Sequence, residues 1–77
     1  MNTPLEFGDR LSDLRFQHNV GQKELGRKLR VVHQTIINWE YGHSYPTFWN
    51  LVEIAKLFNV DLNWLMGHEV HTQEIAA

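Results

Sequence analysis

The stretch from Gln22 to Tyr41 constrains this chain most, because it predicts two short helices joined by a tight turn. Leu25 and Leu29 lie four residues apart and therefore fall on one face of the first helix. Ile36 and Trp39 recur three residues apart and define the inward face of the second helix. The two apolar faces indicate a pair of helices that pack against a shared core.

Gly26 has no side chain, and it lies where a helix-turn-helix brings its two helices closest. Two short helices, a tight turn and a small residue at the contact are the sequence form of this unit. In DNA-binding proteins the second helix of such a unit enters the major groove. The stretch therefore predicts a DNA-reading helix at about residues 33–41.

The stretch resembles the helix-turn-helix of the phage repressor and Cro family, the XRE-like regulators, and the similarity extends over about residues 6 to 67. The positions that match the family's pattern are Arg15, Val20, Gln22, Leu25, Ile36, Trp39, Glu40, Gly42, Pro46, Leu51, Ile54, Ala55, Val60, Leu62, Leu65 and Gly67. The resemblance implies an all-α fold of five short helices in the lambda-repressor-like arrangement, with the helix-turn-helix at its centre.

The chain has 77 residues, no cysteine and 43% hydrophobic residues, which suits one small helical domain without disulfides. We expect this domain to span residues 1–67, and residues 68–77, which lack periodicity, to form a flexible C-terminal tail. No apolar run reaches membrane-spanning length, and no signal peptide is apparent. The sequence therefore predicts a cytoplasmic protein with no membrane partner.

The formal net charge is −2, although DNA-binding domains usually carry a basic surface. The charge is polarised, because every lysine and arginine except Lys56 lies between Arg10 and Arg30. We therefore expect a modest attraction to phosphates that salt readily weakens.

The first helix is predicted to begin at a capping box, Thr3-Pro4-Leu5-Glu6, and to end near His18. Asn19 is suited to the left-handed conformation that ends a helix. The predicted apolar face of this helix is formed by Phe7, Leu11 and Leu14.

The predicted turn of the helix-turn-helix departs from the family's pattern. Gly21 and Val32 precede the two helices where the family usually has a serine or threonine cap. Arg30 occupies a position that is mostly glycine in the family, because the backbone there tends to positive φ. We expect the unit to form with a strained turn, and Gly42 to end its second helix.

Two further helices are predicted after this unit. Thr47 caps a fourth helix that ends at Asn59, and Asp61 caps a short fifth helix, Leu62 to Met66, that Gly67 closes. The predicted core-facing stripe of the fourth helix consists of Phe48, Leu51, Ile54, Ala55 and Phe58.

Arg15 and Glu40 match a structural ion pair of the family, in which an arginine of the first helix bonds a glutamate at the end of the recognition helix. The resemblance implies that this pair orients the recognition helix and performs no chemistry. The alternative is that the two residues are unrelated solvated charges.

The resemblance implies a base-reading set, which consists of Val32, His33, Gln34, Ile37 and Asn38. Glutamine and asparagine can bond adenine, histidine can donate to guanine, and a valine methyl group can contact thymine. An aliphatic residue such as Ile37 on this surface suggests either a thymine contact or a protein partner. The alternative for the set is that these are ordinary solvent-facing residues.

Gln22 resembles the residue that begins the second helix of the family and bonds a DNA phosphate. Weaker phosphate candidates are Lys23, Arg27, Lys28, Arg30 and Thr35. A group of charges of this size is also typical of a simple solvated face.

Five histidines raise the question of a metal site or an active site, but His68 and His71 have no cysteine or other ligands around them. No nucleophile or phosphate-binding loop has a recognisable setting. We therefore expect no enzyme activity, metal or cofactor. Trp49 and Trp64 lie off the main core stripes, where they either pack at the edge of the core or anchor a dimer or partner interface.

These observations predict sequence-specific binding of double-stranded operator DNA by a phage- or prophage-like transcription regulator, in the form of a homodimer on a pseudo-palindrome. A different class remains open, in which the fold is a protein-binding module that acts as an antirepressor or modulator of a repressor partner. A third alternative is the antitoxin of a toxin–antitoxin pair.

Overall fold

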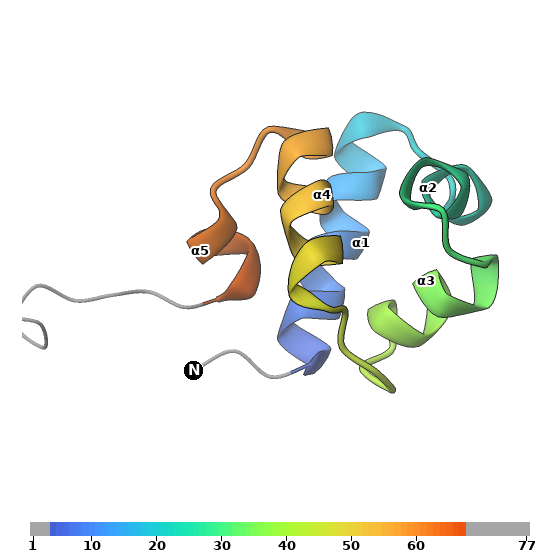
Figure 1. Ribbon diagram of the computed structural model, residues 1–77, viewed down its shortest axis with the longest axis horizontal. Coiled ribbons are helices and arrows are strands. Elements are labelled where there is room, and N and C mark those ends of the chain that lie inside the picture. Colours follow the sequence, from blue (N-terminus) through green and yellow to red (C-terminus); the bar gives the residue numbers. More distant parts are fainter. Residues whose placement is uncertain (1–3, 68–77) are drawn as a thin grey trace, which may run out of the picture.

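The computed structural model describes residues 4–67 and contains five helices with no strand in this range (Figure 1). The helices are α1 (Pro4–His18), α2 (Gln22–Leu29), α3 (His33–Glu40), α4 (Phe48–Phe58) and α5 (Leu62–Met66). The predicted all-α fold is confirmed. The expected Thr3 cap and the expected tail after Gly67 lie outside the described residues.

In Figure 1, α2 and α3 lie at one end of the molecule, α5 lies at the other, and α1 and α4 occupy the middle. α1 packs against α3 and α5, whereas α4 packs against α2 and α5. None of these helices is both long and apolar enough to cross a membrane.

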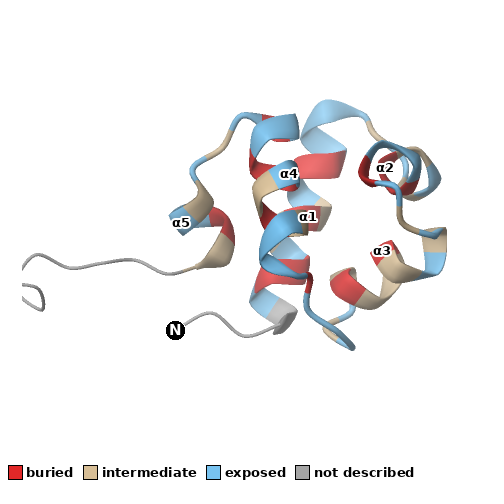
Figure 2. Ribbon diagram, viewed as in Figure 1, coloured by how far each residue is buried: buried red, intermediate tan, exposed pale blue. Residues whose placement is uncertain are grey.

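A single hydrophobic core draws side chains from all five helices (Figure 2). Its buried members are Phe7, Leu11, Leu14, Leu25, Leu29, Ile36, Trp39, Leu51, Ile54, Ala55, Phe58 and Leu65. Burying each large side chain contributes about 1.5–3 kcal/mol relative to leaving it in water. The apolar faces predicted for the first three helices are confirmed.

The prediction for Phe48 was wrong, because 56% of this residue is exposed. Phe48 occupies the first position of α4, and the buried stripe begins one turn later at Leu51. Its ring packs edge-on against Trp49, with 5.7 Å between ring centroids. Tyr45, in the preceding loop, contacts the core residue Phe7 instead, at 5.2 Å between centroids.

The helix ends follow the predicted local chemistry. Thr47 and Asp61 each accept a hydrogen bond from the backbone amide three residues ahead, at 3.2 and 3.1 Å. Asn19 and Asn59 adopt positive φ values of 60° and 55°, and Gly67 does so at 71°. These caps satisfy backbone groups that would otherwise have no partner at the helix ends.

Gly8 allows the backbones of α1 and α3 to touch. A Cβ atom at this position would lie 2.6 Å from the carbonyl oxygen of Trp39 and still closer to that of Glu40. Any side chain here would therefore push the end of α3 away from α1. This role of Gly8 was not predicted from the sequence.

The turn between α2 and α3 combines a close approach with an unusual backbone conformation. A Cβ atom on Gly26 would lie 2.9 Å from the carbonyl oxygen of Val31, as expected for the tight contact. Arg30 adopts φ 59° and ψ 40°, which confirms the predicted left-handed conformation. Neither Gly21 nor Val32 provides a side-chain cap, so both predicted departures at the helix starts are present.

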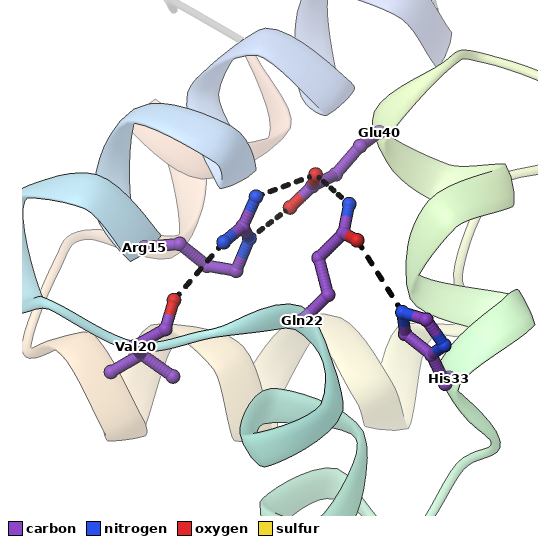
Figure 3. A network of polar contacts seen from close by, with 5 residues as sticks. All are labelled: Arg15, Val20, Gln22, His33 and Glu40. Atoms are coloured by element: carbon purple, nitrogen blue, oxygen red, sulfur yellow. Dashed lines mark hydrogen bonds and ion pairs between the residues drawn. The ribbon is translucent and has the colours of Figure 1, made fainter.

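Arg15 joins α1 to the last residue of α3 (Figure 3). Its Nε donates to Oε2 of Glu40, and its Nη2 donates to Oε1 at 3.0 Å. The two side chains are only 9% and 7% exposed. The third nitrogen, Nη1, donates to the backbone oxygen of Val20 at 3.1 Å. The pair expected from the resemblance is therefore present, and it is largely buried.

We predict that Arg15→Ala and Glu40→Ala each destabilise the domain by about 3–5 kcal/mol, because each leaves a buried charge without its partner. In a double-mutant cycle measured by urea unfolding, the two changes should couple by about 0.5–3 kcal/mol. Additive effects would show that the pair contributes nothing as a pair.

We predict that Arg30→Gly raises the free energy of unfolding by about 1 kcal/mol, because glycine adopts positive φ without the strain that arginine carries. Thermal unfolding measures the change, and Asn59→Gly is the matched control. Asparagine tolerates this conformation better than arginine, so the control should gain less. An unchanged or lower melting temperature for Arg30→Gly would mean that the turn has adapted to arginine.

Candidate nucleic-acid interface

The face of α3 opposite the core carries the residues that the sequence analysis placed at base-reading positions. Val32, just before the helix, is 69% exposed, and Gln34 is also exposed. His33, Ile37 and Asn38 are half-buried. Ile37 is thus less accessible than expected, and Val32 is the more exposed aliphatic residue.

Gln34 and Asn38 lie one turn apart on α3 and bond each other. Nε2 of Gln34 donates to Oδ1 of Asn38 at 3.1 Å. This contact leaves Oε1 of Gln34 and the amino group of Asn38 available. The pair can therefore offer one acceptor and one donor to a ligand, which is the combination that the major-groove edge of adenine complements.

Gln22 and His33 belong to the polar network around the ion pair (Figure 3). Nε2 of Gln22 donates to Oε1 of Glu40 at 2.9 Å. Nε2 of His33 lies 3.4 Å from Oε1 of Gln22. The sequence predicts separate roles for these residues and gives no sign of the connection between them, because only the packing of α1, α2 and α3 brings them together.

Four exposed cations lie on α2 and in the turn that follows it: Lys23, Arg27, Lys28 and Arg30. Within residues 4–67 none of them forms an ion pair, so their charges face solvent unneutralised. Thr35 is half-buried in the first turn of α3. In the sequence, the four cations therefore directly precede α3, which carries the polar face.

The two tryptophans in question reach the surface. Trp49 is 75% exposed, and Trp64 is 42% exposed with the guanidinium of Arg10 5.6 Å from its ring centroid. Among the described residues, no three potential metal ligands gather into a cluster.

Comparison with protein families matches residues 8–69 to the helix-turn-helix domain family. The transcriptional activator BcrR of Enterococcus faecalis is 35% identical over 65 residues, which are 84% of this chain and 32% of BcrR. The regulator DicA of Escherichia coli is 29% identical over 62 residues, 80% of this chain and 46% of DicA. The chain thus spans less than half of the length of each of these two relatives.

Two solved structures share the fold. The P22 c2 repressor, in complex with a synthetic operator, superposes with a TM-score of 0.75 at 24% identity, over 82% of this chain and 96% of the repressor. The restriction-modification controller protein C.AhdI of Aeromonas hydrophila gives 0.73 at 21% identity, over 80% and 90% of the two chains.

An HTH-type transcriptional regulator of Methanocaldococcus jannaschii matches over nearly its whole length. It is 36% identical over 61 residues, 79% of this chain and 92% of the archaeal protein. With residues 8–69 matched to the domain family and five helices arranged as in the P22 repressor, the chain belongs to the XRE-like helix-turn-helix family.

Proposed function

We propose that this chain is a sequence-specific DNA-binding transcription regulator that reads the major groove of an operator with α3. The observation that carries the proposal is the polar outer face of α3 with the Gln34–Asn38 pair, preceded in the chain by four exposed cations on α2 and its turn. Amide side chains read base edges, and cations bind phosphates. The relatives named as transcriptional regulators support the same function.

The base-reading set in this proposal is Val32, His33, Gln34, Ile37 and Asn38. The phosphate-binding set is Gln22, Lys23, Arg27, Lys28, Arg30 and Thr35. We place this activity in the cytoplasm, where the DNA of a bacterium or an infecting phage is accessible. The formal charge of −2 implies that binding depends on local cations, so salt should weaken it strongly.

We further propose that the chain binds DNA as a homodimer, because one small helix-turn-helix domain covers only a half-site. The exposed rings of Trp49 and Trp64 are the candidates for the contact between the two copies. Large aromatic side chains are common anchors of such interfaces. Titration should give two chains per duplex, and a one-to-one complex would contradict this arrangement.

A second function has one specific observation in its favour. Val32 is 69% exposed at the start of α3, and an aliphatic side chain there fits a protein surface as well as a thymine methyl group. In that case the chain is an antirepressor-like module or an antitoxin with a protein partner. Selection from a random DNA library at low salt separates the two functions, because a pure protein-binding module enriches no sequence.

We predict that Gln34→Ala weakens binding to the selected duplex by about 1–3 kcal/mol and relaxes the base preference at one position. The loss follows from removing one member of the amide pair that faces the groove. Gln17→Ala on α1, another exposed glutamine, is the control and should bind like the unmodified chain. Unchanged affinity and an unchanged base preference in Gln34→Ala would argue against base reading by Gln34.

We predict that Lys23→Ala weakens binding to every duplex about equally and lowers the slope of log affinity against log salt by about one. A phosphate contact releases counterions but carries no sequence information. Lys56→Ala on α4 removes the same charge outside the helix-turn-helix and should leave the slope unchanged. Equal effects of the two changes would reduce the role of Lys23 to its contribution to net charge.

A further inference from the structure

The network in Figure 3 begins with two groups that each have a single hydrogen-bonding role. The guanidinium of Arg15 can only donate, and the carboxylate of Glu40 can only accept. Arg15 donates to both oxygens of this carboxylate. Glu40 therefore has no proton to offer to a third residue, and anything else that bonds it must be a donor.

Gln22 is the third residue, and the carboxylate decides which way its amide points. The group that lies 2.9 Å from Oε1 of Glu40 must be the amino group, because an amide oxygen there would face another acceptor. The amide oxygen of Gln22 is thereby turned toward His33. The orientation of an amide is normally ambiguous, but here its charged neighbour settles it.

The same reasoning continues to His33. Its Nε2 lies 3.4 Å from the amide oxygen of Gln22, which can only accept, so Nε2 must carry the proton. The other ring nitrogen, Nδ1, has no hydrogen bond within residues 4–67. It is not a buried atom without a partner either, so it reaches solvent. In a neutral imidazole with a proton on Nε2, Nδ1 is an acceptor.

We propose that the Arg15–Glu40 pair, acting through Gln22, fixes the tautomer of His33, so that His33 presents an acceptor to the major groove. His33 then reads a base that offers an amino group, the N6 of adenine or the N4 of cytosine, and not guanine, whose N7 and O6 need a donor. This replaces the expectation that His33 donates to guanine. The proposal rests on the proposed function, and it makes Gln22 and Glu40 positioning residues.

The first test needs no DNA. Nitrogen-15 NMR of the full chain at alkaline pH should show the His33 proton on Nε2 alone. Gln22→Met keeps the length of the side chain but removes its hydrogen bonds, so His33 should then populate both tautomers. Gln17→Met, the same change at an exposed site of α1, should leave the His33 signals unchanged. A mixed tautomer in the unmodified chain, or no response to Gln22→Met, would overturn the proposal.

The second test measures base preference by selection from a library of random DNA duplexes. One position of the site should lose its base preference in the variant His33→Ala. In sites selected by the unmodified chain, this position should carry adenine or cytosine on the contacted strand. Gln22→Met should accept guanine at that position as well, because His33 can then donate through either nitrogen. Guanine at that position in the unmodified chain's sites, or no position that relaxes, would overturn the proposal.

A base analogue isolates the single contact. If adenine is selected, replacing it with purine removes only the amino group, and the unmodified chain should lose about three- to tenfold in affinity. If cytosine is selected, an analogue without the N4 amino group serves in the same way. The variant His33→Ala should bind the analogue duplex and the natural duplex with the same affinity. If it loses as much affinity on the analogue as the unmodified chain does, the contact is excluded. If no sequence is enriched, the proposed function fails, whereas the NMR result still tests the tautomer on its own.

Discussion

The buried contact between α1 and the end of α3 is the constraint on which the placement of the outer face of α3 depends. The backbones touch at Gly8, and beside this contact Arg15 and Glu40 form a two-point ion pair whose side chains are less than a tenth exposed. Unpaired charges at such depth would be costly. Both charges are paired only in this placement of the two helices, and a shifted placement would break their hydrogen bonds. A bidentate contact fixes direction as well as distance. The contacts at the C-terminal end of α3 therefore determine the orientation of the whole helix on the domain.

This constraint explains why the two ends of α3 are not independent. Glu40 is the last residue of the helix and His33 is the first, yet Gln22 of α2 links them through its amide group. The α2 helix thus contributes more to the site than its cations. The carboxylate of Glu40 accepts hydrogen bonds both from Arg15, at the end of α3, and from Gln22, which contacts His33 at the start of α3.

Much of the fold could be predicted from the sequence, because local chemistry determines it. Apolar spacing identified the helical faces, and short polar residues identified the caps at Thr47 and Asp61. The left-handed backbone at Arg30 followed from the resemblance, since arginine alone gives no sign of it. Phe48 was assigned to the core wrongly because spacing cannot tell where along a helix the core begins. The role of Gly8 and the link from Gln22 to His33 escaped prediction because both depend on which helices meet.

The outer surface of α3 therefore divides into two parts with different physical coupling. His33 is tied to the ion pair, so its chemistry is inherited from residues that also stabilise the domain. The side-chain amides of Gln34 and Asn38 bond only each other among the described residues, so both amides can reverse together without disturbing the core. Under the proposed function, substitutions in the second part would change base preference at little cost in stability. Those in the first part must preserve the polarity of the network, which restricts them more severely.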